Sequence, residues 1–385
     1  MSVTQITDDN IDTGIDASKL AGSVLPAMDG SALTGINVGT SLLKNGFNPA
    51  VDTNPADGVG AIWINTVSGQ MFSCTDATTD QNTWTNMGSG TGHITYVPYY
   101  YQGTQYGYNS NGYQNNVAVD SYERYSYPSG TPSNIVGNLT STMLQGTGHS
   151  SATHGYQAGW GAQIFKFSFA TNGNASLVGN MSVYHEGGGG ASSEDNGYHL
   201  GGYAPGNAVS MIEKFNFAAD TVYGNIGSLT VHRYNITGHS SPTHGYATGG
   251  PHPTPVLIID RVAFANDTSA VHVGNLSKAP YNKWADHSSL THGFATGMSL
   301  SPTVTHIEKF AFAASSNSSD VADLSALTDG AVGTSETNNG YTSGGTDTGS
   351  NKWTKIDKFS FASTTTATNV GNLAIARIYA AGQQI

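Results

Sequence analysis

The sequence predicts an all-β protein whose main body, residues 92–385, is a six-bladed β-propeller. Three observations point to this fold class: the composition favours strands and turns, a seven-residue aromatic phrase recurs six times, and the two ends of the repeat region complete each other. An extended segment, residues 1–48, and a small β-hairpin module, residues 49–91, precede the repeats.

The composition is that of strands and turns. The 385 residues include 49 Gly and 13 Pro, and only 10% are charged, whereas long surface helices draw on Glu, Lys, Arg and Ala. The single cysteine, Cys74, excludes an internal disulfide, so stability must come from packing, from metal or from association with other chains.

The net charge argues against two classes of partner. With 14 basic and 26 acidic residues, the formal charge is -12, which supplies no positive field for nucleic acid or anionic lipid. The acidic N-terminus lacks the features of a secretory signal, and no run of roughly 18 apolar residues is present to span a bilayer. We therefore expect neither nucleic-acid binding nor membrane insertion.

Three phrases define the repeat. The aromatic phrase, "IEKFNFA" in one copy, starts at intervals of 42, 48, 47, 48 and 49 residues, at Tyr122, Ile164, Ile212, Ile259, Ile307 and Ile356. A "VGNL" motif or a relative follows each copy, at Val136, Val178, Ile226, Val273, Val321 and Val370. An aromatic residue after Gly precedes each copy, at Tyr113, Tyr156, Tyr198, Tyr246, Phe294 and Tyr341.

Each phrase is expected to be a strand. Phe215 and Phe217 share one face of an extended segment, whereas a helix would place them about 200° apart. The repeat length accommodates three or four strands with tight turns, so the natural unit is a blade of antiparallel sheet. The paired aromatic residues are then expected to pack on the next blade, at about 1.5–3 kcal/mol for each Phe.

The chain ends favour closure of the ring. The chain stops at "RIYAAGQQI", where the last repeat lacks its Gly-Tyr strand, and "YGYNSNGYQ" at residues 106–114 supplies one before the first aromatic phrase. We expect the first and last parts of the repeat region to share a blade, which removes free sheet edges. The glycine pairs after an aromatic residue resemble the kelch repeat, although the usual kelch Tyr and Trp spacing is not reproduced.

The N-terminal quarter resembles virion fibres. Residues 1–48 are polar with isolated Ile and Leu, so they cannot bury a core alone. "DASKLAG" and "LPAMDGSALTGI" are similar to the attachment and shaft segments of bacteriophage tail fibres, and the module with Trp63, Ile64, Met71, Phe72 and Trp84 looks like tryptophan-containing modules of marine phage fibres.

The repeats carry a similar resemblance. "IDKFSFA...VGNL" and "GHSSxTHGYxxGG" are similar to repeats in virion proteins of phages that infect marine bacteria, notably cyanobacteria. The resemblance implies localisation in the virion and assembly into a homo-oligomer, a trimer. It also implies that the N-terminal segment contacts other virion proteins and that the propeller binds a host surface glycan or protein.

Histidine pairs five residues apart recur in three repeats, at His149 and His154, His239 and His244, and His287 and His292. A catalytic site occurs once per chain, so a set repeated by blade favours a structural role in which imidazole and hydroxyl groups bond the backbone. Metal binding is the alternative, because imidazole is a common ligand, but this spacing places the two side chains on opposite faces of a strand. We predict no metal and no cofactor.

A charged column runs through the aromatic phrases. Its basic members are Arg124, Lys166, Lys214, Arg261, Lys309 and Lys358, and five of them follow an acid, at Glu123, Glu213, Asp260, Glu308 and Asp357. We interpret them as ion pairs between blades or as side chains whose stems cover apolar surface.

Signals for catalysis are few. Propeller glycosidases need two carboxylates across a pocket, and Glu186, Glu194, Asp195 and Asp347 have no partner that spacing identifies. "TDTGSNKW" approaches the aspartate box of sialidases, but its Trp is one residue late and no other repeat has the box. We predict that the protein is not an enzyme.

Binding is the function that remains. The frame is constant, whereas the loop before each aromatic phrase varies and should emerge on one face of the ring. The candidate binding residues on these loops are Trp160, Tyr203, His252 and Trp353. The leading hypothesis is a non-enzymatic virion protein, a tail fibre or similar appendage, that binds a host receptor. The alternatives are a head or neck decoration that contacts other virion proteins, and a glycan-degrading propeller enzyme.

Overall fold

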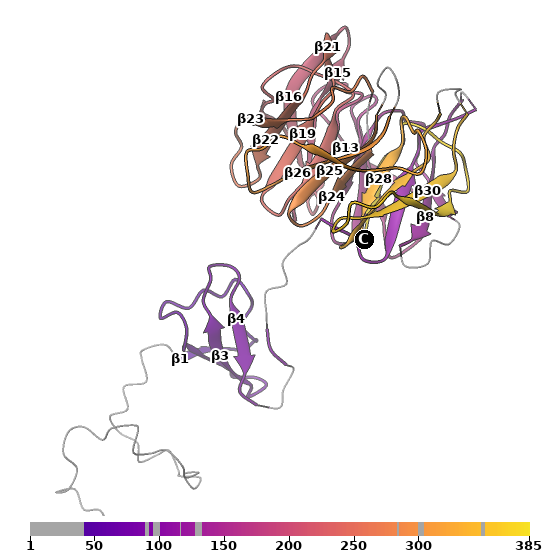
Figure 1. Cartoon of the computed structure of the whole chain (residues 1–385). Coiled ribbons are helices and arrows are strands. Elements are labelled where there is room, and N and C mark those ends of the chain that lie inside the picture. Colours follow the sequence, from indigo (N-terminus) through magenta and orange to yellow (C-terminus); the bar gives the residue numbers. More distant parts are fainter. Residues whose placement is uncertain are drawn as a thin grey trace, which may run out of the picture. The chain divides into compact units, whose positions relative to one another are not determined.

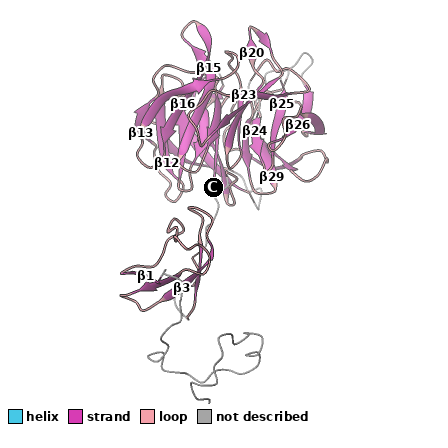
Figure 2. Ribbon diagram, turned by 90° about the vertical axis from the view of Figure 1, so that its left-hand side faces the viewer, coloured by secondary structure: helices cyan, strands magenta, loops and turns pink. Residues whose placement is uncertain are grey.

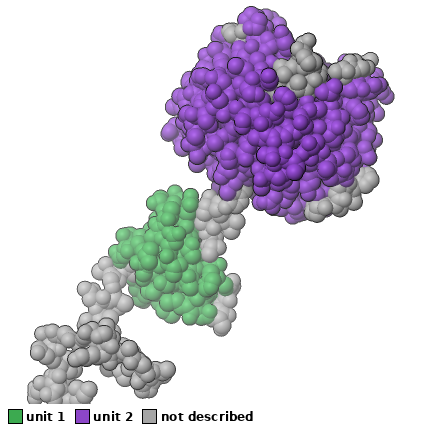
Figure 3. All heavy atoms as spheres, in the orientation of Figure 1, with its two compact units in different colours: residues 1–98 green, residues 99–385 purple. Residues whose placement is uncertain are grey.

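The protein is all-β in the computed structural model, which describes residues 42–88, 92–94, 101–115, 117–127, 133–282, 285–298, 304–347 and 351–385 (Figure 2). Within these ranges there is no helix, and so none that is long and apolar enough to cross a membrane. The chain divides into two compact units, Met1–Pro98 and Tyr99–Ile385 (Figure 3). The expectations for residues 1–41 lie outside the described residues.

The small unit is a four-stranded sheet formed by β1 (Leu42–Asn45), β2 (Ile62–Asn65), β3 (Met71–Asp76) and β4 (Thr83–Asn86). Alternation of side chains buries Trp63, Phe72, Cys74 and Trp84 on one face. The boundary predicted at residue 49 is wrong, because β1 pairs in parallel with β2 and Leu43 packs on this core.

The predicted boundary at residue 92 also shifts. Ile94 continues the small sheet through two backbone hydrogen bonds with Trp84, of 2.6 and 2.8 Å, and the division between the units falls between Pro98 and Tyr99.

The larger unit contains six four-stranded antiparallel sheets among the described residues (Figure 1). The two ends of the unit share the closing sheet, whose order is β32 (Ala381–Gln384), β5 (Tyr106–Ser110), β8 (Ser121–Ser126), β9 (Asn134–Asn138). The second sheet is β10 (Thr147–Ser150), β11 (His154–Ala158), β12 (Gln163–Ser168), β13 (Ser176–Asn180). The third is β14 (Gly189–Ser192), β15 (Asn196–Ala204), β16 (Asn207–Asn216), β17 (Val222–Ser228).

The remaining sheets repeat this order. The fourth sheet is β18 (Thr237–Ser240), β19 (His244–Thr248), β22 (Ile258–Ala263), β23 (Val271–Asn275). The fifth is β24 (Ala285–Ser288), β25 (His292–Met298), β26 (Val304–Ala311), β27 (Ser319–Asp323), and the sixth is β28 (Val332–Ser335), β29 (Asn339–Ser343), β30 (Lys355–Ser360), β31 (Thr368–Asn372). Two short hairpins extend from the frame, β6 (Tyr113–Gln114) with β7 (Val117–Ala118) and β20 (Pro251–His252) with β21 (Thr254–Pro255).

The pairing register corrects one assignment of the repeat. In five sheets the aromatic residue after Gly opposes the basic residue of the next strand, as Tyr156 opposes Lys166. In the closing sheet Tyr108, not Tyr113, opposes Arg124. The sequence "YGYNSNGYQ" contains two Gly-Tyr pairs, and Asn111 and Gly112, with φ of 55° and 99°, turn the chain out of the strand before the second pair is reached.

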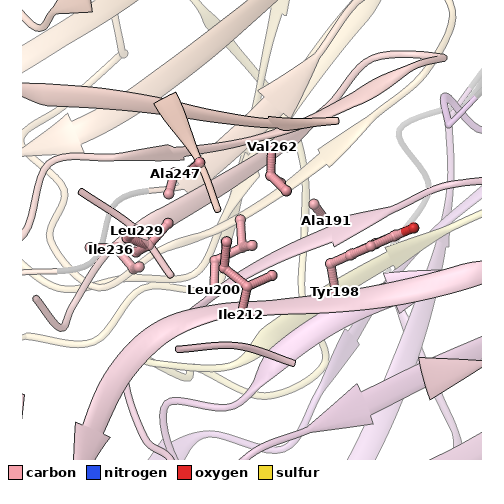
Figure 4. Packing of buried hydrophobic residues seen from close by; sticks show 9 residues of the cluster. Ala191, Tyr198, Leu200, Ile212, Leu229, Ile236, Ala247 and Val262 are labelled. Carbon is pink, nitrogen blue, oxygen red and sulfur yellow. The ribbon is translucent and has the colours of Figure 1, made fainter. Parts of the chain in front are cut away.

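Aromatic stacking joins consecutive sheets, as the sequence predicts. The aromatic residue of the second strand packs on the last aromatic residue of the phrase in the following sheet, so Tyr156 stacks on Phe217 with ring centroids 4.7 Å apart. The equivalent pairs are Tyr108 with Phe169, Tyr198 with Phe264, Tyr246 with Phe312, Phe294 with Phe361, and Tyr341 with Tyr127. Aliphatic residues fill the space between the third and fourth sheets (Figure 4).

The first strands of the six sheets are joined by a second set of bonds. The amide of Ser150 donates to Oγ of Ser192 at 3.2 Å, and the same bond continues from Ser192 to Ser240, Ser288 and Ser335, then to Oε1 of Gln384, and from Gln384 to Ser150. Glycine stands two residues before five of these six residues, because neighbouring strands lie so close that a side chain would clash. A Cβ on Gly238, for example, would lie 2.1 Å from the carbonyl oxygen of Gly190.

Candidate functional site

The repeated histidines belong to this frame. The side chains of His149, His239 and His287 are buried, and Nδ1 of His239 lies 3.1 Å from the carbonyl oxygen of His287 while Nε2 lies 3.1 Å from Oγ1 of Thr248. Burial lowers the pKa of His239 to about 4 and that of His287 to about 3. The rings of His239 and His287 are therefore neutral near pH 7. Both nitrogens of all three histidines are engaged in bonds that fix neighbouring strands.

The second histidine of each pair lies at a hairpin. Nδ1 of His154, His244 and His292 is 2.8 Å from the hydroxyl of the preceding threonine. Each pair therefore spans two adjacent strands rather than one. Within the described ranges no three His, Cys, Asp or Glu side chains form a cluster that could hold a metal ion.

The acidic residues of the charged column have partners that spacing did not identify. Glu123 lies 2.8 Å from Arg377 and Asp260 lies 2.9 Å from Arg233, and all four side chains are fully buried. His185 lies 2.7 Å from Glu213 at the equivalent place. The arginines and His185 come from the links between sheets.

The basic residues of the column behave as predicted in part. Lys166 and Lys214 form ion pairs with Asp220 and Asp267 of the following sheets, at 3.0 and 2.9 Å. Other members lie over aromatic rings, as Lys309 does over Phe294 at 5.4 Å from the centroid. These contacts are structural and lie away from the variable loops.

The variable loops and the links between sheets meet at one end of the larger unit, which we call the connection end. Because each sheet is antiparallel, the turn between its second and third strands lies at the same end as the link that leaves its fourth strand. In Figure 1 the tips of β15 and β21 mark this end, and the C-terminus lies at the other.

Three of the predicted binding residues can be placed at the connection end. Trp160 follows β11 and Tyr203 lies near the tip of β15. Trp353 precedes β30, and the Nζ of Lys355 lies 5.2 Å from the centroid of its ring. His252 belongs to β20, but its side chain lies outside the described residues. The structure thus places Trp160 and Tyr203 in adjacent sheets, the second and the third, and Trp353 in the sixth sheet.

Trp160 and Tyr203 belong to a row of aromatic residues that continues along the links between sheets. The row consists of five residues: Trp160, Tyr184, Tyr203, Tyr234 and Tyr281. The centroids of Trp160 and Tyr184 are 6.1 Å apart, and those of Tyr203 and Tyr234 are 5.3 Å apart. The Nδ2 of Asn235, the residue after Tyr234, lies 3.5 Å from the carbonyl oxygen of Tyr281, so the backbone of Tyr281 lies next to the link that carries the fourth member.

Glu186 joins the two halves of the aromatic row. Its backbone forms two hydrogen bonds with that of Tyr203, of 3.1 and 2.8 Å, and its Oε2 accepts a hydrogen bond from the hydroxyl of Tyr184 at 3.1 Å. Burial and this carboxylate raise the pKa of Tyr184 to about 12, so the phenol stays protonated. Glu186 therefore links the two aromatic pairs, through its carboxylate to one and through its backbone to the other.

The backbone holds the aromatic row rigidly. The amide of Trp160 donates to the carbonyl of His185 at 2.6 Å, and the left-handed φ of 45° at Trp160 turns its ring toward the link. Links are also bonded to one another, since the amide of Gly187 donates to the carbonyl of Gln145 at 2.9 Å and that of Ile236 to Gly187 at 3.1 Å. A preorganised surface of this kind loses little conformational entropy on binding.

A polar cavity of about 380 Å³ lies at the opposite end of the second and third sheets. His154, Lys166, Asn174 and Asp220 are among its lining residues, and the bond between Lys166 and Asp220 crosses it. Because Lys166 and Asp220 already pair with each other, the cavity has fewer groups left to bind a ligand than the aromatic row has. A search of protein-family models and of curated proteins finds no match to this chain.

Three of the five residues of the aromatic row were not predicted from the sequence. The loop before each aromatic phrase varies between repeats, and this variation indicates Trp160 and Tyr203. Tyr184, Tyr234 and Tyr281 lie in the links, where each stands three or five residues after the residue that ends the "VGNL" motif. That recurrence of tyrosine was the available signal, and the antiparallel order of the strands explains why links and loops meet.

Proposed function

We propose that the larger unit is a closed six-bladed β-propeller. Three sets of contacts support this proposal, because each runs through all six sheets and returns to the first. They are the aromatic stacking, the amide bonds from Ser150 round to Gln384, and the contacts between first strands, in which β10 neighbours both β32 and β14. The pairing of β32 with β5 removes the free edge that an open array would leave.

We further propose that this propeller is the receptor-binding part of a non-enzymatic virion protein, a tail fibre or similar appendage, and that the aromatic row is its binding surface. The observation that carries the proposal is the rigid aromatic row at the connection end. Aromatic side chains on a rigid frame are the groups most often found at binding hot spots.

The position of the aromatic row within the larger unit supports the same function. The residues that lead into this unit lie at the opposite end, where Gly103 bonds to Ser335 and Gln105 bonds to the carbonyl of Ile385. The chain therefore enters the larger unit at the end opposite to the aromatic row. The virion assignment rests on the resemblance of the N-terminal segment and the repeats to phage fibre proteins.

Binding of the labelled full-length chain to envelope fractions of marine cyanobacteria tests the proposal. The variant Tyr203→Ala with Tyr281→Ala should weaken binding at least about tenfold, because each ring contributes on the order of 1 kcal/mol. Tyr223→Ala is the control, since Tyr223 is 55% exposed against 56% for Tyr281 and lies at the opposite end.

Three outcomes would contradict this assignment. The first is the absence of saturable binding to any envelope fraction, and the second is an equal loss of binding in the control. The third is release of reducing sugar from the envelope, which would indicate an enzyme. If the row variant instead blocks incorporation of the protein into particles while cell binding persists, the aromatic row contacts other virion proteins, as in a head or neck decoration.

A further inference from the structure

We infer that the aromatic row binds a glycan without acidic groups and that Glu186 is the residue that determines this specificity. The inference rests on the proposed function, because it names the ligand class of the same surface. It is carried by two aromatic pairs at the connection end that Glu186 links, through its carboxylate to Tyr184 and through its backbone to Tyr203.

The side chains of the row suit a sugar chain. Flat rings pack against the C–H faces of a pyranose, and a carboxylate accepts hydrogen bonds from its hydroxyl groups, so recognition needs both in alternation. Here Glu186 lies between the pair Trp160 and Tyr184 and the pair Tyr203 and Tyr234. The five members of the row are all Trp or Tyr, whereas the cores of protein interfaces also use Met and Arg.

Glu186 is held as an acceptor. The hydroxyl of Tyr184 donates to its Oε2 at 3.1 Å, which is one bond of the roughly four that an ionised carboxylate can accept. Its backbone is fixed by the two bonds to Tyr203. These contacts hold Glu186 in place, and its carboxylate keeps acceptor capacity for the hydroxyl groups of a ligand.

The same charge disfavours an acidic ligand. A uronic acid or sulfate on a sugar stacked against these rings would lie within several ångströms of the Glu186 carboxylate, where like charges repel by about 1 kcal/mol or more. The formal charge of the whole chain, -12, acts in the same direction over longer distances. The link that carries Tyr281 has one basic residue close to it in the sequence, Lys278, three residues before Tyr281. This link follows the fourth sheet, whereas Glu186 lies in the link that precedes the third.

Titration of the full-length chain with two matched ligands tests the inference: a hexasaccharide of neutral hexoses and the corresponding hexasaccharide of hexuronic acids. The native chain should bind the neutral ligand at least about tenfold more tightly. Glu186→Gln keeps the shape and the acceptor oxygen but removes the charge, so it should raise affinity for the acidic ligand about fivefold and change affinity for the neutral one less than about twofold.

Glu194→Gln serves as the control, because this exposed residue lies in the hairpin between β14 and β15 at the opposite end. It should leave the ratio of the two affinities unchanged. Tyr281→Ala provides a second test, since it should weaken binding of the neutral ligand about fivefold.

The inference is overturned if the native chain binds both ligands equally, if Glu186→Gln leaves their ratio unchanged, or if only an envelope protein is bound. In each of those cases the proposed receptor-binding function stands. If no envelope fraction and no glycan is bound at all, the proposed function fails together with the inference.

Discussion

The closing sheet and the second sheet of the larger unit differ at one buried place, where the first has an ion pair and the second has two apolar side chains. At the place where a link crosses the third strand of a sheet, the closing sheet has Arg377 against Glu123, a fully buried ion pair 2.8 Å long. The second sheet has Met143 and Phe165 at the equivalent positions, and both are fully buried as well.

The comparison of all six sheets shows that each carboxylate buried at this place has a partner. The third and fourth sheets have His185 with Glu213 and Arg233 with Asp260 at this place. Where the link supplies no basic group, other residues serve: Lys355 lies 3.1 Å from Asp357, and Ser277 and Ser318 donate to Glu308. A buried carboxylate is costly without a partner, so the frame tolerates a complete pair of either kind but not half of one.

Breaking the ion pair of the closing sheet should have the largest effect. Arg377→Met leaves Glu123 buried without its cation, and it also removes the bonds from Arg377 to the carbonyls of Asn111 and Ser121, of 2.8 and 2.9 Å. We expect a loss of about 3–5 kcal/mol in the free energy of unfolding. Chemical denaturation monitored by tyrosine and tryptophan fluorescence measures it, and Lys278→Met is the exposed control. A loss below about 1 kcal/mol would show that the pair is not needed.

The ring of amide bonds should be the next most sensitive feature. Five sheets supply a serine hydroxyl and the closing sheet supplies Gln384, yet the bond is the same. Ser240→Ala leaves the buried amide of Ser192 without its acceptor, and Gln384→Ala does so for Ser335. Each should cost about 2 kcal/mol in the same denaturation experiment. A cost in one variant alone would mean that the closing sheet is held differently from the others.

Much of this frame could be predicted from the sequence because it repeats. Period-two aromatic residues identify the third strand, and the copies of "GHSS" and "VGNL" identify the first and fourth. The assignment failed where a copy is degenerate: "AGQQ" at residues 381–384 is the first strand of the closing sheet, and Tyr108 rather than Tyr113 holds its aromatic position.

The proposed binding surface is harder to predict, because it depends on contacts between segments far apart in the sequence. Variation among loops indicates Trp160 and Tyr203, but Glu186 lies in a link and meets Tyr203 only because the sheets are antiparallel. The buried cations are missed for a similar reason. Arg377 and Glu123 are separated by most of the repeat region, and no local pattern joins them.

Acid should reveal the pair that contains a histidine. Burial alone would raise the pKa of Glu213, but hydrogen bonds from His185 and Ser182 outweigh it and lower the pKa below its ordinary value. A lowered pKa stabilises the fold at pH values above the unfolded pKa of about 4.3, and this contribution is lost as the pH falls toward the folded value.

The apolar pair of the second sheet provides the comparison for this titration. The double variant His185→Met with Glu213→Phe lacks the titrating carboxylate, so acid should not remove this contribution from it. As the pH falls from about 6 into the acid range, we expect the native chain to lose on the order of 1 kcal/mol of unfolding free energy relative to this variant. Denaturation at a series of pH values checks it. A difference that is constant with pH would mean that Glu213 ionises alike in the folded and unfolded chains.

Transferring the apolar pair into the closing sheet should have the smallest effect. Arg377→Met with Glu123→Phe reproduces Met143 and Phe165 in a frame with the same strand register, and it removes both charges at once. Replacement of a buried ion pair by apolar residues of similar volume is often neutral, so we expect a change within about 1 kcal/mol, far less than the loss in Arg377→Met alone. The double variant still loses the two bonds from Arg377 to the carbonyls of Asn111 and Ser121. Water that reaches those carbonyls from the connection end would reduce this cost. A double variant as unstable as the single one would show that the arginine holds the backbone of this sheet rather than balancing the charge of Glu123.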